Sequence, residues 1–149
     1  MRSLGRNGLF FAGLLAFCLI GQAVAETPIA VENAWSRATP AQARAGAAFF
    51  VVRNHGANDD TLVAADSDVA DSVELHTHIH DNGVMRMRPV ADILVPAGGL
   101  AELKPGGLHV MLIGLRAPLE EGSTFTLGLT FAHAGHMTVP VTVKGIGAR

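Results

Sequence analysis

Histidine and methionine side chains recur close together along this chain, and both can act as neutral donors to soft metal ions. His109 and Met111 lie two positions apart in the stretch GLHVMLIGL, which otherwise contains only apolar residues and glycine. Residues two apart in a β-strand point to the same face, so the pair lies opposite Leu108, Val110 and Leu112. We expect His109 and Met111 to form a pair on the surface away from the core, although a strand covered on both faces would show a similar pattern.

A second group of histidines and methionines brackets the dipeptide Asn82-Gly83, a strong signal for a hairpin with a two-residue turn. With that turn, one face of the hairpin carries His76, His78, His80, Met85 and Met87. A three-residue loop would shift the register by one residue and turn the methionines toward the core. Hydrophobic patterning favours this second register, because it exposes Arg86 and Arg88, and a bulge could reconcile the two. The sequence leaves the register open.

Two imidazoles and two thioethers would make a selective metal site. Thioether sulfur is a poor ligand for calcium and magnesium, which bind oxygen, and structural zinc sites usually contain thiolate, imidazole or carboxylate. Mixed histidine and methionine ligation without cysteine selects Cu(I). Because all four ligands are neutral, an incoming ligand can displace them, which suits carriage of the ion better than permanent storage.

The elements that must position these side chains are β-strands. Alternation dominates the chain, as in TFTLGLTF, where Phe125, Leu127, Leu129 and Phe131 share one face. Short apolar runs are separated by turn-forming residues, which is typical of an antiparallel sandwich or barrel. The fold class is therefore predicted to be all-β, with strands at 29–35, 45–53, 61–66, 72–80, 84–90, 92–95, 107–114, 123–131 and 138–144.

The first 25 residues have the pattern of a secretory signal peptide. Two arginines precede an apolar segment from Leu9 to Ile20, and Ala23-Val24-Ala25 follows as a cleavage site with small residues. The bulky Phe17 before Cys18 argues against a lipoprotein signal. We predict cleavage after Ala25, a single exported domain over residues 26–149, and no membrane span in the mature protein.

Composition excludes several classes of function for the mature part. The single cysteine leaves with the signal, so disulfides and thiolate sites are ruled out within it. Without the signal, nine basic and thirteen acidic residues give a net charge of −4, which makes nucleic acid an unexpected partner. No nucleophile-and-base motif is evident, so we do not expect an enzyme. The alternative function, a cupredoxin-type copper redox protein, would need a cysteine ligand at a blue-copper site.

The spacing of the four donors resembles a known signature. Ten residues separate His76 from Met87, twenty-one separate Met87 from His109, and Met111 follows one residue later. This pattern is similar to that of the periplasmic copper A chaperones. The flanking segments also resemble that family over nearly the whole mature chain, in ENAWSRATP, GAAFFVVRN, VELHT, VMRMRPV and GGLHVMLIGL.

The resemblance implies a cupredoxin-like β-sandwich or Greek-key barrel, monomeric and located in the periplasm. It implies that Cu(I) is bound by His76, Met87, His109 and Met111. It also implies that the protein passes copper to the copper A centre in the copper-bearing subunit of cytochrome c oxidase, or to another copper chaperone of oxidase assembly.

Several histidines and methionines fall outside this four-residue pattern. Imidazole-rich sites suit Cu(II), so some of them form a hypothetical second site. The alternative is an exposed polar loop, which we favour for His133 and His136. The residues concerned are His78, His80, Met85, His133, His136 and Met137.

Overall fold

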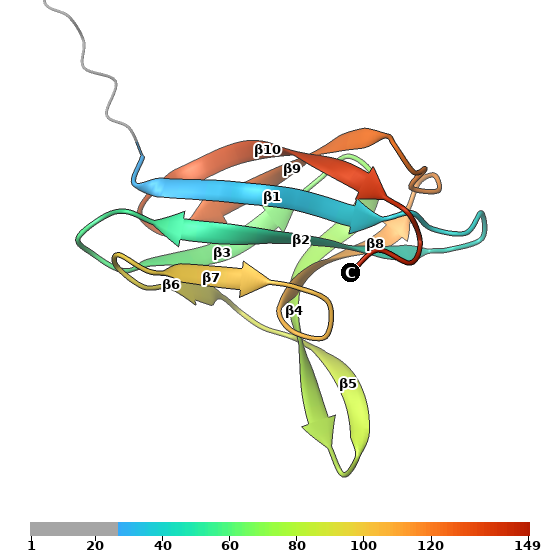
Figure 1. Cartoon of the computed structure of the whole chain (residues 1–149), viewed down its shortest axis with the longest axis horizontal. Helices are drawn as coiled ribbons and strands as arrows, with labels where there is room; N and C mark the ends of the chain where they lie inside the picture. The colour runs from blue at the N-terminus through green and yellow to red at the C-terminus, as the bar shows by residue number, and fades with distance from the viewer. Residues whose placement is uncertain (1–26) are drawn as a thin grey trace, which may run out of the picture.

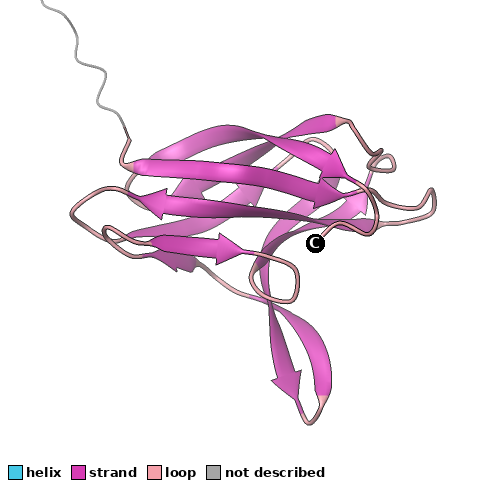
Figure 2. Ribbon diagram, viewed as in Figure 1, coloured by secondary structure: helices cyan, strands magenta, loops and turns pink. Residues whose placement is uncertain are grey.

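The computed structural model describes residues 27–149 of the 149-residue chain. The signal peptide predicted over residues 1–25 lies outside the described residues. The described part consists of strands, turns and loops (Figures 1 and 2), and it contains no helix long and apolar enough to cross a membrane. Its strands are β1 (Ile29–Arg37), β2 (Ala45–Asn54), β3 (Asp60–Asp66), β4 (Ala70–Asp81), β5 (Val84–Pro89), β6 (Ile93–Val95), β7 (Leu100–Leu103), β8 (His109–Leu115), β9 (Thr124–Phe131) and β10 (Gly135–Lys144).

Nine of these strands were predicted from the sequence to within a few residues, and β7 was not. Strand β7 is only four residues long, LAEL, and lies between the turn sequences PAGG and KPGG. So short a segment carries too little alternation to be recognised. It exists because it pairs antiparallel with the second half of β2, after β8 has paired with the first half.

The strands form one strongly bent sheet in the order β5-β4-β8-β2-β1-β10-β9-β3-β6, with β7 on β2. In Figure 1, β1 and β2 lie in front of β3 and β9, so the sheet folds over to make two layers. The predicted all-β sandwich is confirmed. One pair departs from a purely antiparallel arrangement, because β1 runs parallel to β10, with Trp35 opposite Thr142.

The core fills the space between the two layers and follows the predicted alternation. In β9, Leu127, Leu129 and Phe131 are buried, while Thr126 is exposed and Thr130 is half-buried. The continuous apolar run of β2 is central, as predicted, with neighbours on both sides. Its inward residues Phe50 and Val52 are buried, and removing such side chains from water is the main stabilising contribution to the fold.

The β4–β5 hairpin extends away from this body (Figure 1). Its turn has the two-residue register, with positive φ at both Asn82 (48°) and Gly83 (80°) as a type I′ turn requires. The facing pairs are therefore Asp81 with Val84, His80 with Met85, and His78 with Met87.

The three-residue register that hydrophobic patterning favoured is wrong. Every residue of β5 is exposed, so this strand has no core-facing side. Neither register would bury the methionines, so a preference for buried methionine and exposed arginine does not distinguish the two registers. The turn decides it instead, and Arg86 lies 3.6 Å from the carboxylate of Asp81 on the hairpin itself.

Candidate metal centre

Two predicted ligands, His76 and His109, face each other on neighbouring strands. They are register partners in the antiparallel pair β4–β8, and their ring centres are 5.8 Å apart. This juxtaposition follows from the topology, because β4 and β8 are neighbours in the sheet although many residues separate them in the chain. The structure thus brings together the first and third donors of the sequence pattern.

His109 is only 1% exposed, so the expectation that it lies at the surface is wrong. Strand β8 is covered here on both faces, and Phe49 approaches the imidazole with its ring centre 6.4 Å away. The Nδ1 atom of His109 donates to the carbonyl of Gly107 at 3.0 Å, since a carbonyl can only accept. The opposite atom, Nε2, is buried and has no hydrogen-bond partner. It therefore presents a free lone pair.

The surroundings of His109 keep its imidazole neutral. Burial lowers the pKa of His109, and the nearby His78 and His76 lower it further, while the hydrogen bond to Gly107 acts in the opposite direction. A neutral imidazole is the form that binds a metal ion. This donor is therefore ready to bind at neutral pH without first losing a proton.

In His76, as in His109, one ring nitrogen has a hydrogen-bond partner and the other has none. Its Nε2 lies 2.8 Å from Oε2 of Glu74, and a carboxylate can only accept, so Nε2 carries the proton. Its Nδ1 is buried and lacks a partner. A buried polar atom without a partner costs folding free energy. Binding of a metal ion would give Nδ1 a partner and remove this cost. A metal-binding histidine fixed through its other nitrogen by a carboxylate is a common arrangement.

The two predicted thioethers, Met87 and Met111, line one surface cavity of about 260 Å³. Met111 projects from β8 two residues beyond His109, and Met87 projects from the exposed strand β5 opposite His78. Phe49 lines this cavity and also lies beside His109, so the cavity and the imidazole pair adjoin. Met87 is 50% exposed, which leaves this donor free to move.

Together the four side chains supply two nitrogen and two sulfur donors without formal charge. Over residues 27–149, no three His, Cys, Asp or Glu side chains are grouped so that they could hold a metal ion. A complete coordination shell in this region would therefore need the thioethers. Such a shell favours a soft monovalent ion over calcium, magnesium or zinc.

The six histidines and methionines considered for a second site lie at three positions. His78 lies within the cluster, with its ring centre 5.1 Å from that of His109 and its Nδ1 3.3 Å from the Gly107 carbonyl. His80 and Met85 face each other near the tip of the hairpin. The other three lie around the β9–β10 turn, where Met137 packs against the core and the exposed imidazoles are those of His133 and His136. These positions do not combine into one second site.

Sequence reasoning missed three residues that shape the candidate centre. Glu74 alternates with the histidines of β4, and its place on their face of the strand is the signal that could have identified it as a partner of His76. Phe49 gave no signal, since it reads as another core residue of β2. The carbonyl of Gly107 also gave none, because a backbone group that orients both His78 and His109 appears only in the folded chain.

Most of the described chain matches a known protein family. Residues 29–143 match the family described as "Putative lipoprotein LpqE-like". A relative named "Putative lipoprotein Lxx21020" from Leifsonia xyli subsp. xyli is 37% identical over 129 residues, which cover 82% of this chain and 76% of the relative.

Solved structures with the same fold are also known. A domain titled "Apo PCuAC domain from PmoF1" superimposes with a TM-score of 0.69 at 24% identity, over 79% of this chain and 94% of that one. The protein DR1885 from Deinococcus radiodurans matches in its apo form at 30% identity and a TM-score of 0.64, over 98% and 100% of the two chains. Its form titled CuI-DR1885 matches at 33% identity and a TM-score of 0.59, over 83% and 81%.

Proposed function

The chain belongs to the LpqE-like family, and from this premise we propose that it is an exported copper chaperone whose cargo is Cu(I). In this proposal the ion is bound by His76, Met87, His109 and Met111. The solved relatives support copper binding, because one of them is a Cu(I) form of a protein that is 33% identical. The ligand set is our extension to this chain.

One observation carries the proposal: two buried imidazole nitrogens, His76 Nδ1 and His109 Nε2, lie on adjacent strands without partners. Each ring is held by an acceptor at its other nitrogen, so the lone pairs are fixed in direction. The neighbouring cavity of Met87 and Met111 supplies soft sulfur atoms. Cu(I) satisfies both kinds of donor, whereas a hard cation would satisfy neither.

Release of the cargo is a ligand exchange and needs no redox step. His109 is buried and fixed, whereas Met87 lies on an exposed hairpin strand, so Met87 is the donor that can leave first. A thiolate of the acceptor would take its place, and the remaining ligands would follow. We propose as acceptor the copper-bearing subunit of cytochrome c oxidase or another copper chaperone, with this protein acting as a monomer and not as an enzyme.

Anaerobic Cu(I) binding against a competing chelator tests the proposal. We expect His109→Ala and Met111→Ala each to weaken binding by at least about tenfold, since losing even an outer-shell contact costs that much. His136→Ala, an exposed imidazole at the β9–β10 turn, is the matched control and should bind as wild type does. X-ray absorption should detect both nitrogen and sulfur around the ion. Equal affinity in all four proteins, or a shell without sulfur, would refute the site.

Binding of Cu(II) is a separate proposal from binding of Cu(I). We propose Cu(II) binding at a single one of the three positions outside the four-donor pattern, since these positions do not combine into one second site. A titration that saturates at one equivalent of copper in both oxidation states would remove this proposal.

We place the mature protein in the periplasm, with the signal peptide cleaved after Ala25. The relatives' names suggest an alternative, a lipid anchor on Cys18. The mass of the mature protein, purified from the membrane and soluble fractions of its host, distinguishes a chain that begins at Glu26 from an acylated chain that begins at Cys18.

A further inference from the structure

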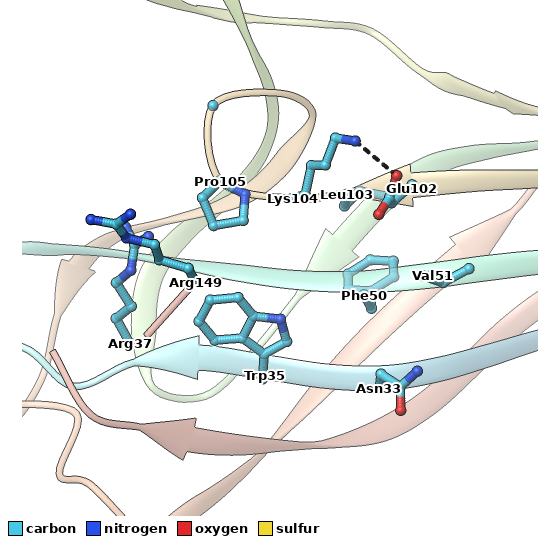
Figure 3. A pocket seen from close by; sticks show the side chains of 11 residues that line it. Asn33, Trp35, Arg37, Phe50, Val51, Glu102, Leu103, Lys104, Pro105 and Arg149 are labelled. Carbon is cyan, nitrogen blue, oxygen red and sulfur yellow. Dashed lines mark hydrogen bonds and ion pairs between the residues drawn. The ribbon is translucent and has the colours of Figure 1, made fainter. Parts of the chain in front are cut away.

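A second hollow, of about 650 Å³, adjoins the candidate centre on the outer face of the sheet. We name it the indole groove; the residues that define it for the argument are Trp35, Arg37, Val51, Lys104, Pro105 and Arg149. Figure 3 shows the Trp35 ring lying between the two arginine side chains and the residues of β2, with Pro105 nearby. The groove thus combines apolar surfaces with a cationic rim.

A β-bulge in β1 turns Trp35 into this groove. Glu32 pairs with Val51, and regular pairing would set Trp35 opposite Ala48, facing the core. The register shifts by one residue between Glu32 and Trp35, so that Trp35 pairs with Phe49 on the outer face. The bulge includes Asn33 at a φ of +54°, a conformation that asparagine tolerates better than most residues.

The groove is joined to the candidate centre by direct contacts. The rings of Trp35 and Phe49 are 4.8 Å apart between centres, and Phe49 is the ring that covers His109. Arg37 lines both the indole groove and the thioether cavity, with its guanidinium 5.8 Å from the centre of the Phe49 ring. A molecule bound in the groove would therefore lie one phenyl ring away from the proposed copper ligands.

Positive charge is concentrated here although the chain as a whole is acidic, with a net charge of −2. Lys144 extends over the Trp35 ring at 4.9 Å and joins Arg37, Lys104 and Arg149, so four of the nine basic residues in the described range gather at this place. Among the described lining residues, Glu102 has the one side-chain carboxylate, and it is bonded to Lys104 at 3.0 Å. A basic cleft on an acidic molecule steers acidic ligands toward itself.

We infer that the indole groove docks an acidic, extended segment of the protein that accepts copper, and so holds the acceptor's thiolates beside Met87 and Met111. This inference rests on the proposed function. The cationic rim fits carboxylates, and the surfaces of Trp35 and Pro105 fit an apolar side chain between them. A small inorganic anion would leave these apolar surfaces uncovered, which favours a peptide segment.

The test exploits the fact that Trp35 is the single tryptophan of a chain without tyrosine, so its fluorescence reports on the groove alone. The apo protein is titrated with a synthetic peptide that has glutamates on either side of a leucine, and with the same peptide carrying lysines instead. We expect a saturable shift in emission with the acidic peptide only. The affinity should fall when the ionic strength is raised to about 0.5 M, because salt screens exposed charges.

A matched pair of double variants locates the binding. Lys104→Gln with Lys144→Gln should weaken binding of the acidic peptide by about tenfold, because charges at the rim of an interface mainly govern association. Arg86→Gln with Arg116→Gln removes the same charge from exposed arginines elsewhere and should change binding less than twofold. Equal losses in both variants, equal binding of both peptides, or binding of anionic phospholipid vesicles without binding of the peptide would overturn the inference.

Copper transfer separates a failure of this inference from a failure of the proposed function. We expect Cu(I) to move faster to a dithiol peptide flanked by glutamates than to one flanked by lysines, and the lysine double variant to abolish this preference without changing Cu(I) affinity. If wild type binds Cu(I) but shows no preference, the groove inference is wrong and the chaperone proposal stands. If wild type binds no Cu(I), the chaperone proposal fails, and so does the copper acceptor as the occupant of the groove.

Discussion

Each candidate histidine is made a donor by the group that binds its other nitrogen. Glu74 accepts from Nε2 of His76 at 2.8 Å and so leaves Nδ1, which is buried without a partner, as the free donor. We predict that Glu74→Gln weakens Cu(I) binding about 10- to 100-fold, the usual cost of losing such a partner, while leaving the four proposed ligands in place. Competition with a Cu(I) chelator measures this. Glu32→Gln, at an exposed glutamate paired with Arg53, should have no effect, and a similar loss there would show that only overall charge matters.

Two methionines of the hairpin provide an internal comparison at the same scale. Met85 and Met87 have nearly equal exposure, 48% and 50%, and both lie on β5, but only Met87 lines the cavity shared with Met111. Met87→Leu should lower Cu(I) affinity by about tenfold or more, because leucine fills similar space without a donor. Met85→Leu should leave affinity unchanged. If the two variants behave alike, Met87 is not a ligand.

At the scale of elements, the exposed strand β5 of the β4–β5 hairpin carries one proposed donor, Met87. Strand β5 pairs only with β4 and covers no core, so its register depends on the turn. At Gly83, with a φ of 80°, a β-branched side chain is strained. We predict that Gly83→Val frays the hairpin and weakens Cu(I) binding severalfold, while the free energy of unfolding of the body changes little.

Amide hydrogen exchange checks this prediction, since fraying should speed exchange in β5 and leave the amides of β9 protected. The control is Gly98→Val, at another turn glycine of positive φ with open space around it and no contact with the candidate centre. That variant should bind Cu(I) as wild type does. Unchanged exchange in β5 would mean that the hairpin tolerates the substitution, and the prediction would fail.

At the scale of the whole molecule, the end with the β9–β10 turn is fastened by a buried carboxylate. Asp60, at the start of β3, accepts backbone hydrogen bonds from His133 and Ala134 at 2.9 Å each and from Thr61 at 2.7 Å. Burial alone would raise the pKa of Asp60, but these three donors outweigh it and lower the pKa below 3.8. The hydrogen bonds of the folded state therefore stabilise the charged form of the Asp60 carboxylate.

Because the folded pKa of Asp60 is lowered, its contribution to stability is present above pH 3.8, the unfolded value, and is lost as the pH falls through the folded pKa. We predict that Asp60→Ala costs about 1–3 kcal/mol at pH 7, since three partly buried donors lose their acceptor. The cost should shrink in acid. Urea unfolding at several pH values measures both effects, and a cost that does not change with pH would contradict the linkage. Cu(I) affinity of the folded variant should not change, because the candidate centre lies at a different part of the sheet.

The sequence by itself determined the fold class, nine of the ten strands, and the identity and spacing of four donor side chains. Alternation is a local pattern, and it predicts a strand wherever the strand has one buried face, as in β9. The resemblance to the copper A chaperones agrees with the family and with the fold of the solved relatives, while the four-donor site stays a prediction.

Only the tertiary structure decided which nitrogens are free and what surrounds the donors, and it resolved a hairpin register that the sequence left open. The Gly107 carbonyl that binds His109 gave no signal in the sequence, whereas Glu74 shares a strand face with His76 and could have been identified from the alternation. The four-residue β7, which the sequence alone did not indicate, forms because β2 offers it an unpaired edge. The contact of the Gly107 carbonyl with the two imidazoles and the pairing of β7 with β2 depend on how the chain folds, and periodicity along the sequence carries no information about such contacts.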